Sequence, residues 1–214
     1  MINLKANIKA ILFDIGGPID SEILNDKLLK FHFIEEFSKH NITIDDSDIE
    51  NCMARLINNF DKNIYLSLCE YFSNDNDNIK ISVYKNILFR SKERDLIRNA
   101  PEISKDVIEV LQYLSINYKL GVVANQTLDA LKLLKNSGIN KYFRNFEVSE
   151  SIGFKKPDER IFLYVMNMLE VSNEECIMIG DRIDNDIIPA NNLNIFSIRI
   201  KTGRFTYQVP RAIS

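Results

Sequence analysis

KAILFDIGGP, residues 9–18, is an apolar run that ends at an aspartate and is followed at once by two glycines and a proline. Its short length, its β-rich composition and the turn residues that close it predict a buried strand. Asp14 then lies at the carboxyl end of the strand, where open α/β sheets bind their ligands. Gly16 and Gly17 let a ligand approach the backbone closely, and Pro18 ends the strand. Taken alone, the same pattern is equally typical of an aspartate in an ordinary turn after a strand.

The composition is that of a globular protein with one large domain, or with a core domain that carries a smaller insertion. The chain has 214 residues, of which 45% are hydrophobic and 27% are charged. The net charge of −3 gives no electrostatic reason to expect nucleic acid or an anionic membrane as partner. No apolar stretch is long enough to span a bilayer, and the N-terminus lacks the features of a signal peptide. We therefore expect a cytoplasmic protein.

The cysteines and histidines do not indicate a metal site. Cys52, Cys69 and Cys176 are far apart and have no metal-ligand spacing, so we expect reduced, buried or incidental thiols. His32 and His40 lie in one helical segment, and we expect them to pack or to face solvent rather than to catalyse.

Residues from about 22 to 98 have helical periodicity and little strand signal, which predicts an inserted helical region. We expect its apolar stripes to form a core rather than to bind a cofactor. A polar loop, residues 73–78, separates the last two predicted helices. The predicted helices cover about 22–40, a segment with the cap candidates Asp46, Ser47 and Asp48, then about 64–72 and 79–94.

From about residue 100, strand and helix patterns alternate, which predicts a mainly parallel sheet covered on both faces. After Ile200 we expect a surface loop. The predicted strands are 118–124, 146–148, 176–180 and 195–200, and the predicted helices begin at Pro101, after Thr127, at Pro157 and near Asn185.

Polar side chains follow the predicted strands at the same end of the sheet. Asp14, Asn125 and Asp181 each come just after an apolar strand, and Lys156 follows the 146–148 segment after a short loop. Because the carboxyl ends of parallel strands meet at one edge, we expect these side chains to converge. Carboxylates suit a hard cation such as Mg²⁺, and lysine suits a phosphate. Asp186, about one helical turn beyond Asp181, adds a third acid.

Four segments resemble the four ordered motifs of the haloacid dehalogenase (HAD) superfamily: FDIGGPI at 13–19, GVVAN at 121–125, GFKKPD at 153–158 and IGDRIDND at 179–186. The resemblance covers residues 8–20 and about 100–200. It implies an α/β fold, with a Rossmann-like, mainly parallel sheet as core and an inserted helical cap. The expected core domain comprises residues 1–20 and 97–214, and the expected cap domain comprises residues 21–96.

The resemblance also implies a role for each matching position. Asp14 is expected to be the nucleophile, which forms an aspartyl-phosphate, and Lys156 to neutralise it and the transferred phosphoryl group. Asn125 is expected to place the substrate through its amide or its backbone N–H. The expected Mg²⁺ ligands are Asp14, the backbone carbonyl of Gly16, Asp181 and Asp186, and the expected phosphate-binding residues are Asn125, Lys156 and Gly17.

Two positions depart from the usual motifs. Family phosphatases usually carry a second aspartate, the general acid and base, where this chain has Gly16, and a serine or threonine where it has Ala124. General acid–base catalysis contributes about 10²–10⁴-fold, or roughly 3–5 kcal/mol. The missing hydroxyl accounts for about 1.5–3 kcal/mol. We therefore expect a slow phosphatase, unless the leaving group needs little protonation or another residue supplies the proton. Candidates nearby in the sequence are Arg182, Asp184 and Glu22. Each of them is more simply expected to be a solvated charge.

Three functions remain open from the sequence. The first is a Mg²⁺-dependent hydrolase of a small phosphorylated metabolite, acting as a monomer or homodimer. The second is a catalytically impaired HAD-fold protein that binds a phosphorylated ligand or partner, which the changes at Gly16 and Ala124 favour. The third is a 2-haloacid dehalogenase; that chemistry does not need Mg²⁺, so the acidic fourth motif argues against it.

Overall fold

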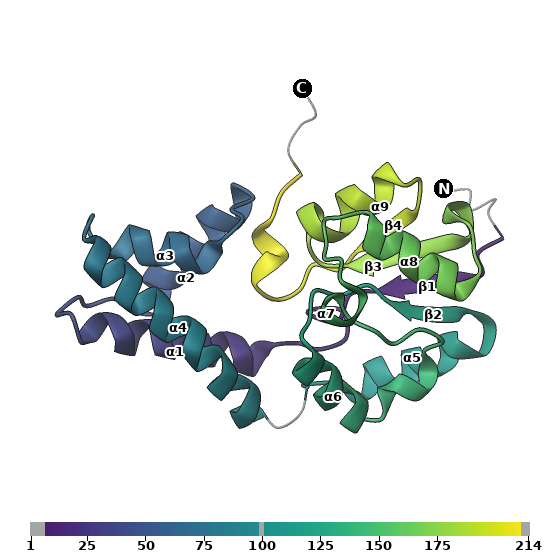
Figure 1. The fold of residues 1–214 in the computed structure, drawn as a ribbon, viewed down its shortest axis with the longest axis horizontal. Coiled ribbons are helices and arrows are strands. Elements are labelled where there is room, and N and C mark those ends of the chain that lie inside the picture. Colours follow the sequence, from purple (N-terminus) through teal and green to yellow (C-terminus); the bar gives the residue numbers. More distant parts are fainter. Residues whose placement is uncertain (1–6, 99–100, 211–214) are drawn as a thin grey trace. The chain divides into compact units, whose positions relative to one another are not determined.

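The structure is a computed structural model and describes residues 7–98 and 101–210. The chain forms two compact units (Figure 1). The first, here called the α/β unit, comprises Met1–Ser21 and Ala100–Gly203, and the second, the helical unit, comprises Glu22–Asn99 and Arg204–Ser214. The chain therefore passes from one unit to the other three times, after Ser21, Asn99 and Gly203.

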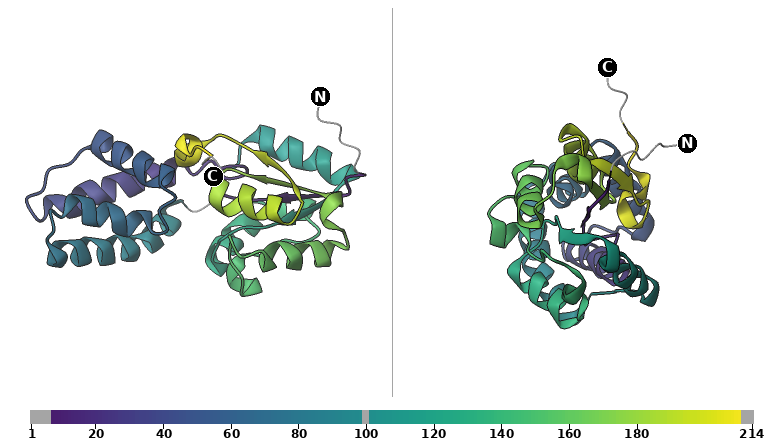
Figure 2. Two further views of the ribbon diagram at one scale, coloured as in Figure 1. Left: turned by 90° about the horizontal axis from the view of Figure 1, so that it is seen from above. Right: turned by 90° about the vertical axis from the view of Figure 1, so that its right-hand side faces the viewer.

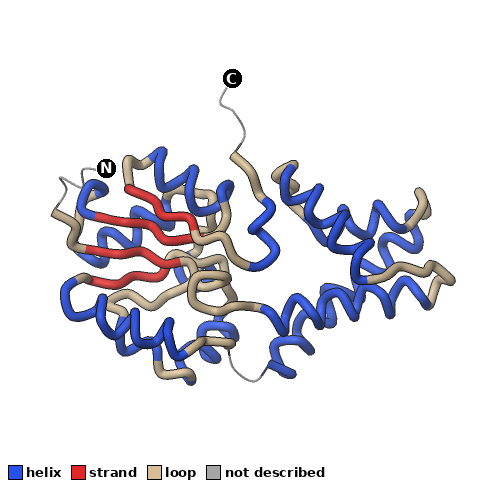
Figure 3. The backbone as a smooth tube through the Cα atoms, turned by 180° about the vertical axis from the view of Figure 1, so that it is seen from behind, coloured by secondary structure: helices blue, strands red, loops and turns tan. Residues whose placement is uncertain are grey.

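The α/β unit is built on a parallel sheet in which β1 (Ala10–Phe13) is central. The strand order is β2 (Lys119–Val122), β1, β3 (Cys176–Gly180) and β4 (Phe196–Arg199). The four strands lie side by side in Figure 3, where they are red. Phe13 is in register with Val122 on one side and with Ile179 on the other, so the carboxyl ends of these strands lie at one edge. The structure thus confirms the predicted α/β fold with a parallel sheet.

Alternate side chains of β1 point to opposite faces of the sheet, and helices cover both faces (Figure 2). Ala10 and Leu12 pack in a core with α8 (Arg160–Leu169) and α9 (Ile188–Asn192). Ile11 and Phe13 pack in a second core with α5 (Lys105–Asn117) and α6 (Leu128–Asn136). The apolar run Ala10–Phe13 is therefore buried on both faces of the sheet.

The predicted strand at 146–148 is wrong. Main-chain contact with β2 ends at Asn145, which forms an isolated parallel bridge to Gly121. The Val148 N–H donates to the hydroxyl of Ser151 instead of to a strand, and α7 (Ser149–Ile152) begins at the next residue. The apolar run is too short to form a ladder before this helix begins.

Three helix starts in this unit differ from the prediction. Helix α8 begins at Arg160 and not at Pro157. Ser104, rather than Pro101, caps α5, because its hydroxyl accepts the N–H of Val107. The helix expected near Asn185 begins as a π-helical segment, Ile183–Ile187, that leads into α9. Thr127 caps α6, as predicted. The remaining short helices of this unit are Ile139–Tyr142 and Asn173–Glu175.

The helical unit contains the four predicted helices, α1 (Ile23–Ser38), α2 (Asp46–Asn58), α3 (Ile64–Phe72) and α4 (Asp77–Arg98). The cap of α2 is Asp45, which forms a capping box with Asp48, so the three cap candidates were placed one or more residues too late. Helix α4 begins two residues before the predicted start. The apolar side chains that form the core of this unit include Leu29, Phe33, Phe37, Ile49, Ile57, Leu68, Val83 and Ile87.

Residues 204–209, which the sequence assigned to the core domain as a surface loop, pack within the helical unit instead. Phe205, in the short helix Gly203–Tyr207, packs against its apolar core. The Arg204 guanidinium pairs with the carboxylate of Asp26 and donates to the hydroxyl of Tyr65, 3.2 Å away. Further along, the N–H of Val209 donates to the side chain of Asn58. One apolar and one charged side chain thus fix this segment.

Cys52, Cys69 and Cys176 are buried free thiols, as predicted. His32 is buried in α1. Among the described residues, every helix is too short or too polar to cross a membrane.

Candidate active site

Asp14 follows β1 directly and is held by the main chain on both sides. Its N–H donates to the carbonyl of Ile179 on β3, and its Oδ1 accepts the N–H of Ile15 at 2.8 Å. The residue is only 8% exposed. Asp14 is therefore fixed at the carboxyl edge of the sheet, where the sequence predicted it.

Gly17 lets the loop after β1 approach Asp181. It has φ 88°, and a Cβ in its place would lie 2.8 Å from Oδ2 of Asp181, closer than real Cβ contacts come. Its N–H donates to the carbonyl of Asp20 at 2.8 Å, so this group is already paired. The geometry supports a role for Gly17 in close packing and gives no support to its predicted role as a phosphate ligand.

Lys156 lies between two carboxylates. Its Nζ is 2.9 Å from Oδ1 of Asp14 and 2.6 Å from Oδ1 of Asp186. The side chain is 2% exposed, so the ammonium group is removed from solvent and depends on these partners. A single cation thus connects the predicted nucleophile with one of the predicted metal-site acids.

Asp186 is fully buried and both of its oxygens have partners. Oδ1 accepts from Lys156, and Oδ2 accepts the main-chain N–H groups of Asp181 and Arg182 at 3.2 and 2.9 Å. Gly180, the last residue of β3, makes room for it, because a Cβ there would lie 2.4 Å from the Cβ of Asp186. Asp186 therefore holds both the lysine and the turn that carries Asp181.

Burial and charge move the pKa of both central groups. Burial raises the pKa of Asp14 to about 6; Lys156 opposes this rise, and the negative charge of Asp186 adds to it. Burial would lower the pKa of Lys156, but Asp14 and Asp186 outweigh it and raise that pKa above the ordinary value. The lysine is therefore charged at neutral pH, while Asp14 carries a destabilised negative charge.

The donor atoms of this cluster fit a hard divalent cation. Carboxylate oxygens of Asp14, Asp181 and Asp186 lie within 4.8 Å of one another. Carboxylate and carbonyl oxygens are the ligands that Mg²⁺ prefers in proteins. The carbonyl of Gly16 accepts no hydrogen bond from any residue in the described part of the chain, so it is available as a further oxygen ligand.

The remaining residues that the sequence singled out, Asn125, Ala124, Arg182 and Asp184, have partners outside the carboxylate cluster. The side chain of Asn125 bonds to the main chain of Lys156. Ala124 is fully buried in an apolar core with Phe13. Among the candidate proton donors, Arg182 and Asp184 form an ion pair with each other at 2.5 Å.

Sequence reasoning missed two residues near Asp181. Thr202 lies against the loop after β1, with its methyl carbon 3.1 Å from the place where a Cβ of Gly17 would be. Arg199 donates from Nε to the carbonyl of Asp181 at 3.1 Å. Both contacts depend on the pairing of β4 with β3. No sequence motif around Arg199 or Thr202 predicts them.

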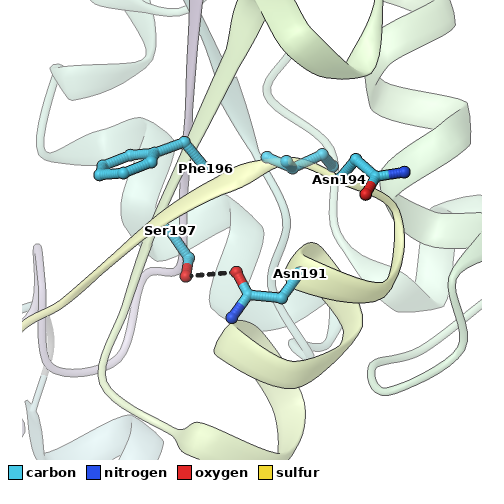
Figure 4. A pocket seen from close by; sticks show the side chains of 5 residues that line it. Asn191, Asn194, Phe196 and Ser197 are labelled. Carbon is cyan, nitrogen blue, oxygen red and sulfur yellow. Dashed lines mark hydrogen bonds between the residues drawn. The ribbon is translucent and has the colours of Figure 1, made fainter. Parts of the chain in front are cut away.

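A separate pocket of about 520 Å³ lies beside the start of β4 (Figure 4). Asn191, Asn194, Ile195, Phe196 and Ser197 line it, and the Ser197 hydroxyl donates to Asn191 at 2.7 Å. Phe196 pairs with Ile177 near the amino end of β3, so the pocket lies at the sheet edge opposite Asp14. Its lining includes no ionisable side chain, and we assign it no chemistry.

Known proteins resemble this chain in sequence and in fold. Glyceraldehyde 3-phosphate phosphatase of Methanopyrus kandleri is 35% identical over 108 residues, which are 50% of this chain and 46% of that protein. The enzyme of the same name from Methanocaldococcus jannaschii is 25% identical over 92% of this chain and 87% of its own. The magnesium-bound crystal structure of the HAD-hydrolase YfnB from Bacillus subtilis has a TM-score of 0.63 at 19% identity, over 91% of this chain and 87% of that one.

The model of the family described as haloacid dehalogenase-like hydrolase matches residues 11–200, which include all four motif segments. This match spans most of both units and confirms the family expected from the motifs. The chain belongs to the haloacid dehalogenase-like hydrolase family.

Proposed function

We propose that the chain is a Mg²⁺-dependent phosphatase that hydrolyses a small phosphorylated metabolite through an aspartyl-phosphate at Asp14. The observation that carries the proposal is the contact of Asp14 with Lys156 beside two further carboxylates, those of Asp181 and Asp186. The two relatives named as glyceraldehyde 3-phosphate phosphatases support a small phosphorylated substrate. The helical unit, inserted after the loop of the nucleophile, is proposed to act as the cap that selects it.

In the first step, a carboxylate oxygen of Asp14 attacks the phosphorus, and the bond from phosphorus to the leaving oxygen breaks. The leaving oxygen takes a proton, and the alcohol departs. Lys156 orients the attacking carboxylate and neutralises charge on the phosphoryl group. Asp14, Asp181 and the Gly16 carbonyl would hold Mg²⁺, which supplies positive charge to the phosphoryl oxygens, and Asp186 would support this set.

In the second step, water attacks the phosphorus of the aspartyl-phosphate, and the bond from phosphorus to Asp14 breaks. This releases inorganic phosphate and restores the carboxylate. Gly16 offers no side chain to move the protons in either step, and a positioned acid or base contributes about 10²–10⁴-fold. We therefore propose slow turnover, with protons exchanged with water.

The first test is hydrolysis of an aryl phosphate with and without Mg²⁺. The wild-type chain should turn over only with the metal, and Asp14→Asn should lose on the order of 10⁴-fold in kcat, because the nucleophile is gone. Asp129→Asn is the matched control, since Asp129 is an exposed α6 carboxylate paired with Lys132. Activity that persists in Asp14→Asn would refute the proposed nucleophile.

A second candidate function, binding of a phosphorylated ligand without turnover, is favoured by the missing side chain at Gly16. Gly16→Asp separates the two, because Gly16 is not among the residues with positive φ and a side chain fits its backbone conformation. If only the acid–base group is missing, this variant should raise kcat by up to about 10²–10⁴-fold. No gain, no phosphorylated Asp14 by mass spectrometry and retained binding of a phosphate analogue would together favour the binding function.

A further inference from the structure

We infer that Asn125 is a positioning residue for Lys156: its side-chain amide fixes the main chain of the lysine, and thereby the ammonium group between Asp14 and Asp186. The catalytic part of this inference rests on the proposed function, whereas the structural part does not. It replaces the expectation that Asn125 places the substrate.

The amide of Asn125 makes a two-point contact with Lys156. Oδ1 accepts the main-chain N–H of Lys156 at 2.7 Å, and Nδ2 donates to the main-chain carbonyl of the same residue at 2.9 Å. Both distances are those of good hydrogen bonds. The contact also matches the side chain of an asparagine, which carries one donor group and one acceptor group in one plane. Each polar atom of the amide is thus engaged with the lysine.

Lys156 has no other main-chain support of this kind. It belongs to no helix or strand, and within the ranges that the structure describes, no backbone group pairs with its N–H or carbonyl. Such groups, when buried, need a partner, and Asn125 provides it for both. Without the amide, the segment before α8 would lose the contacts that fix the lysine main chain.

The loop that carries Asn125 is itself held in place. The carbonyl of Ala124 accepts the N–H of Ser149 at 3.0 Å, and the N–H of Gln126 donates to the Ser149 hydroxyl at 3.1 Å. Thr127 then caps α6. Asn125 therefore extends from an anchored loop, and an anchored group can set the place of its partner.

The lysine is consequently fixed at both ends. Asn125 holds its main chain, and the two carboxylates hold Nζ. A reacting group that is misplaced by about 1 Å can cost about 10²-fold in rate, so the main-chain anchor has a catalytic consequence. We expect Asn125→Ala to lower kcat by about 10–100-fold while KM changes little, because the phosphate loses no direct ligand.

The decisive experiment is NMR of the Lys Nζ groups in the metal-free, lysine-labelled protein, and it needs no activity. The Lys156 signal is identified by its absence in Lys156→Arg. In Asn125→Ala this signal should shift or broaden, and in Asn125→Asp, which keeps the acceptor for the lysine N–H, it should move less. Asn173→Ala is the matched control, since Asn173 also donates to a backbone carbonyl, that of Leu193, at 2.6 Å.

An unchanged Lys156 signal in folded Asn125→Ala would overturn the inference. A rise in KM with kcat unchanged would also overturn it and would restore Asn125 as a substrate ligand. If Asn125→Ala does not fold, Asn125→Asp carries the test alone, with an unchanged signal as the contrary result. If the protein lacks phosphatase activity altogether, the proposed function fails, while the NMR result still decides whether Asn125 positions the lysine.

Discussion

Glu36 in the helical unit and Asp14 in the α/β unit are both buried carboxylates with cationic partners, yet their pKa values move in opposite directions. Burial would raise the pKa of Glu36, but hydrogen bonds from Lys39 and Asn86 and the charge of Arg90 outweigh it and lower that pKa. Burial raises the pKa of Asp14 to about 6, although Lys156 opposes the rise.

The difference lies in how far the partners of each group offset its burial, which is the largest single cause for both. Glu36 has two cations and an amide within 2.7 to 3.2 Å, and its cluster is complete without a ligand. Asp14 shares one lysine with Asp186 and lies close to Asp181. A carboxylate whose partners outweigh its burial stabilises a fold, whereas one whose burial is not offset, beside two further carboxylates, is suited to bind a cation and a phosphoryl group.

The largest expected difference between the two clusters is the loss of unfolding free energy when the cation of each is removed. Lys156→Met leaves buried carboxylates without their partner, so in the absence of Mg²⁺ the free energy of unfolding should fall by about 3–5 kcal/mol. Arg90→Met should cost about 1–2 kcal/mol, because Glu36 keeps Lys39 and Asn86. Urea unfolding of both variants checks this. Equal losses in the two variants would contradict the contrast.

A smaller difference concerns the glycine beside Asp186. In Gly180→Ala, the new Cβ meets the Cβ and carboxylate of Asp186 at 2.4–2.5 Å, and in Gly121→Ala it meets Val165 and Leu169 at 2.7–2.9 Å. Overpacking should cost each variant about 1–3 kcal/mol of unfolding free energy. Only Gly180→Ala should lose stabilisation by Mg²⁺ in thermal unfolding. Retained stabilisation there would argue against Asp186 as a support of the metal site.

The smallest expected effect is the pH dependence of the Glu36 cluster. A carboxyl with a lower pKa in the folded state stabilises the fold above its ordinary pKa, 4.5 for Glu36, and this contribution is lost as pH falls through the lowered value. Stability should therefore fall below about pH 4.5. Glu36→Gln should show a shallower fall in urea titrations between pH 3 and 6; an unchanged slope would mean that Glu36 does not contribute.

The sequence predicted the convergence of Asp14, Lys156 and Asp181 better than it predicted the contacts that hold them. Asp14 and Asp181 were found because they follow apolar strands, and parallel strands bring their carboxyl ends together. Lys156 was placed correctly although the strand predicted before it does not form. The reason is that Asn145 still pairs beside β2, so the segment that leads to Lys156 starts from the sheet. The contact of Asn125 with the main chain of Lys156 depends on the conformations of two loops, which no periodic pattern encodes.

The helical unit was predicted from its periodicity, but its last segment was not. Arg204 and Phe205 lie in a short stretch without a repeating pattern, and their partners lie far away along the chain, at Asp26, Tyr65 and the core of that unit. Such contacts between distant segments leave no local signal.

The third passage of the chain between the units has a consequence for protein engineering. Residues 22–98 do not encode the complete helical unit, because Arg204 and Phe205 complete its packing from the far end of the sequence. A chimera that receives residues 22–98 alone would lack the Arg204 guanidinium that pairs with Asp26. It would also expose the apolar core surface that Phe205 covers. Grafting this unit onto another α/β scaffold therefore requires two cassettes inserted at separate points of the host gene.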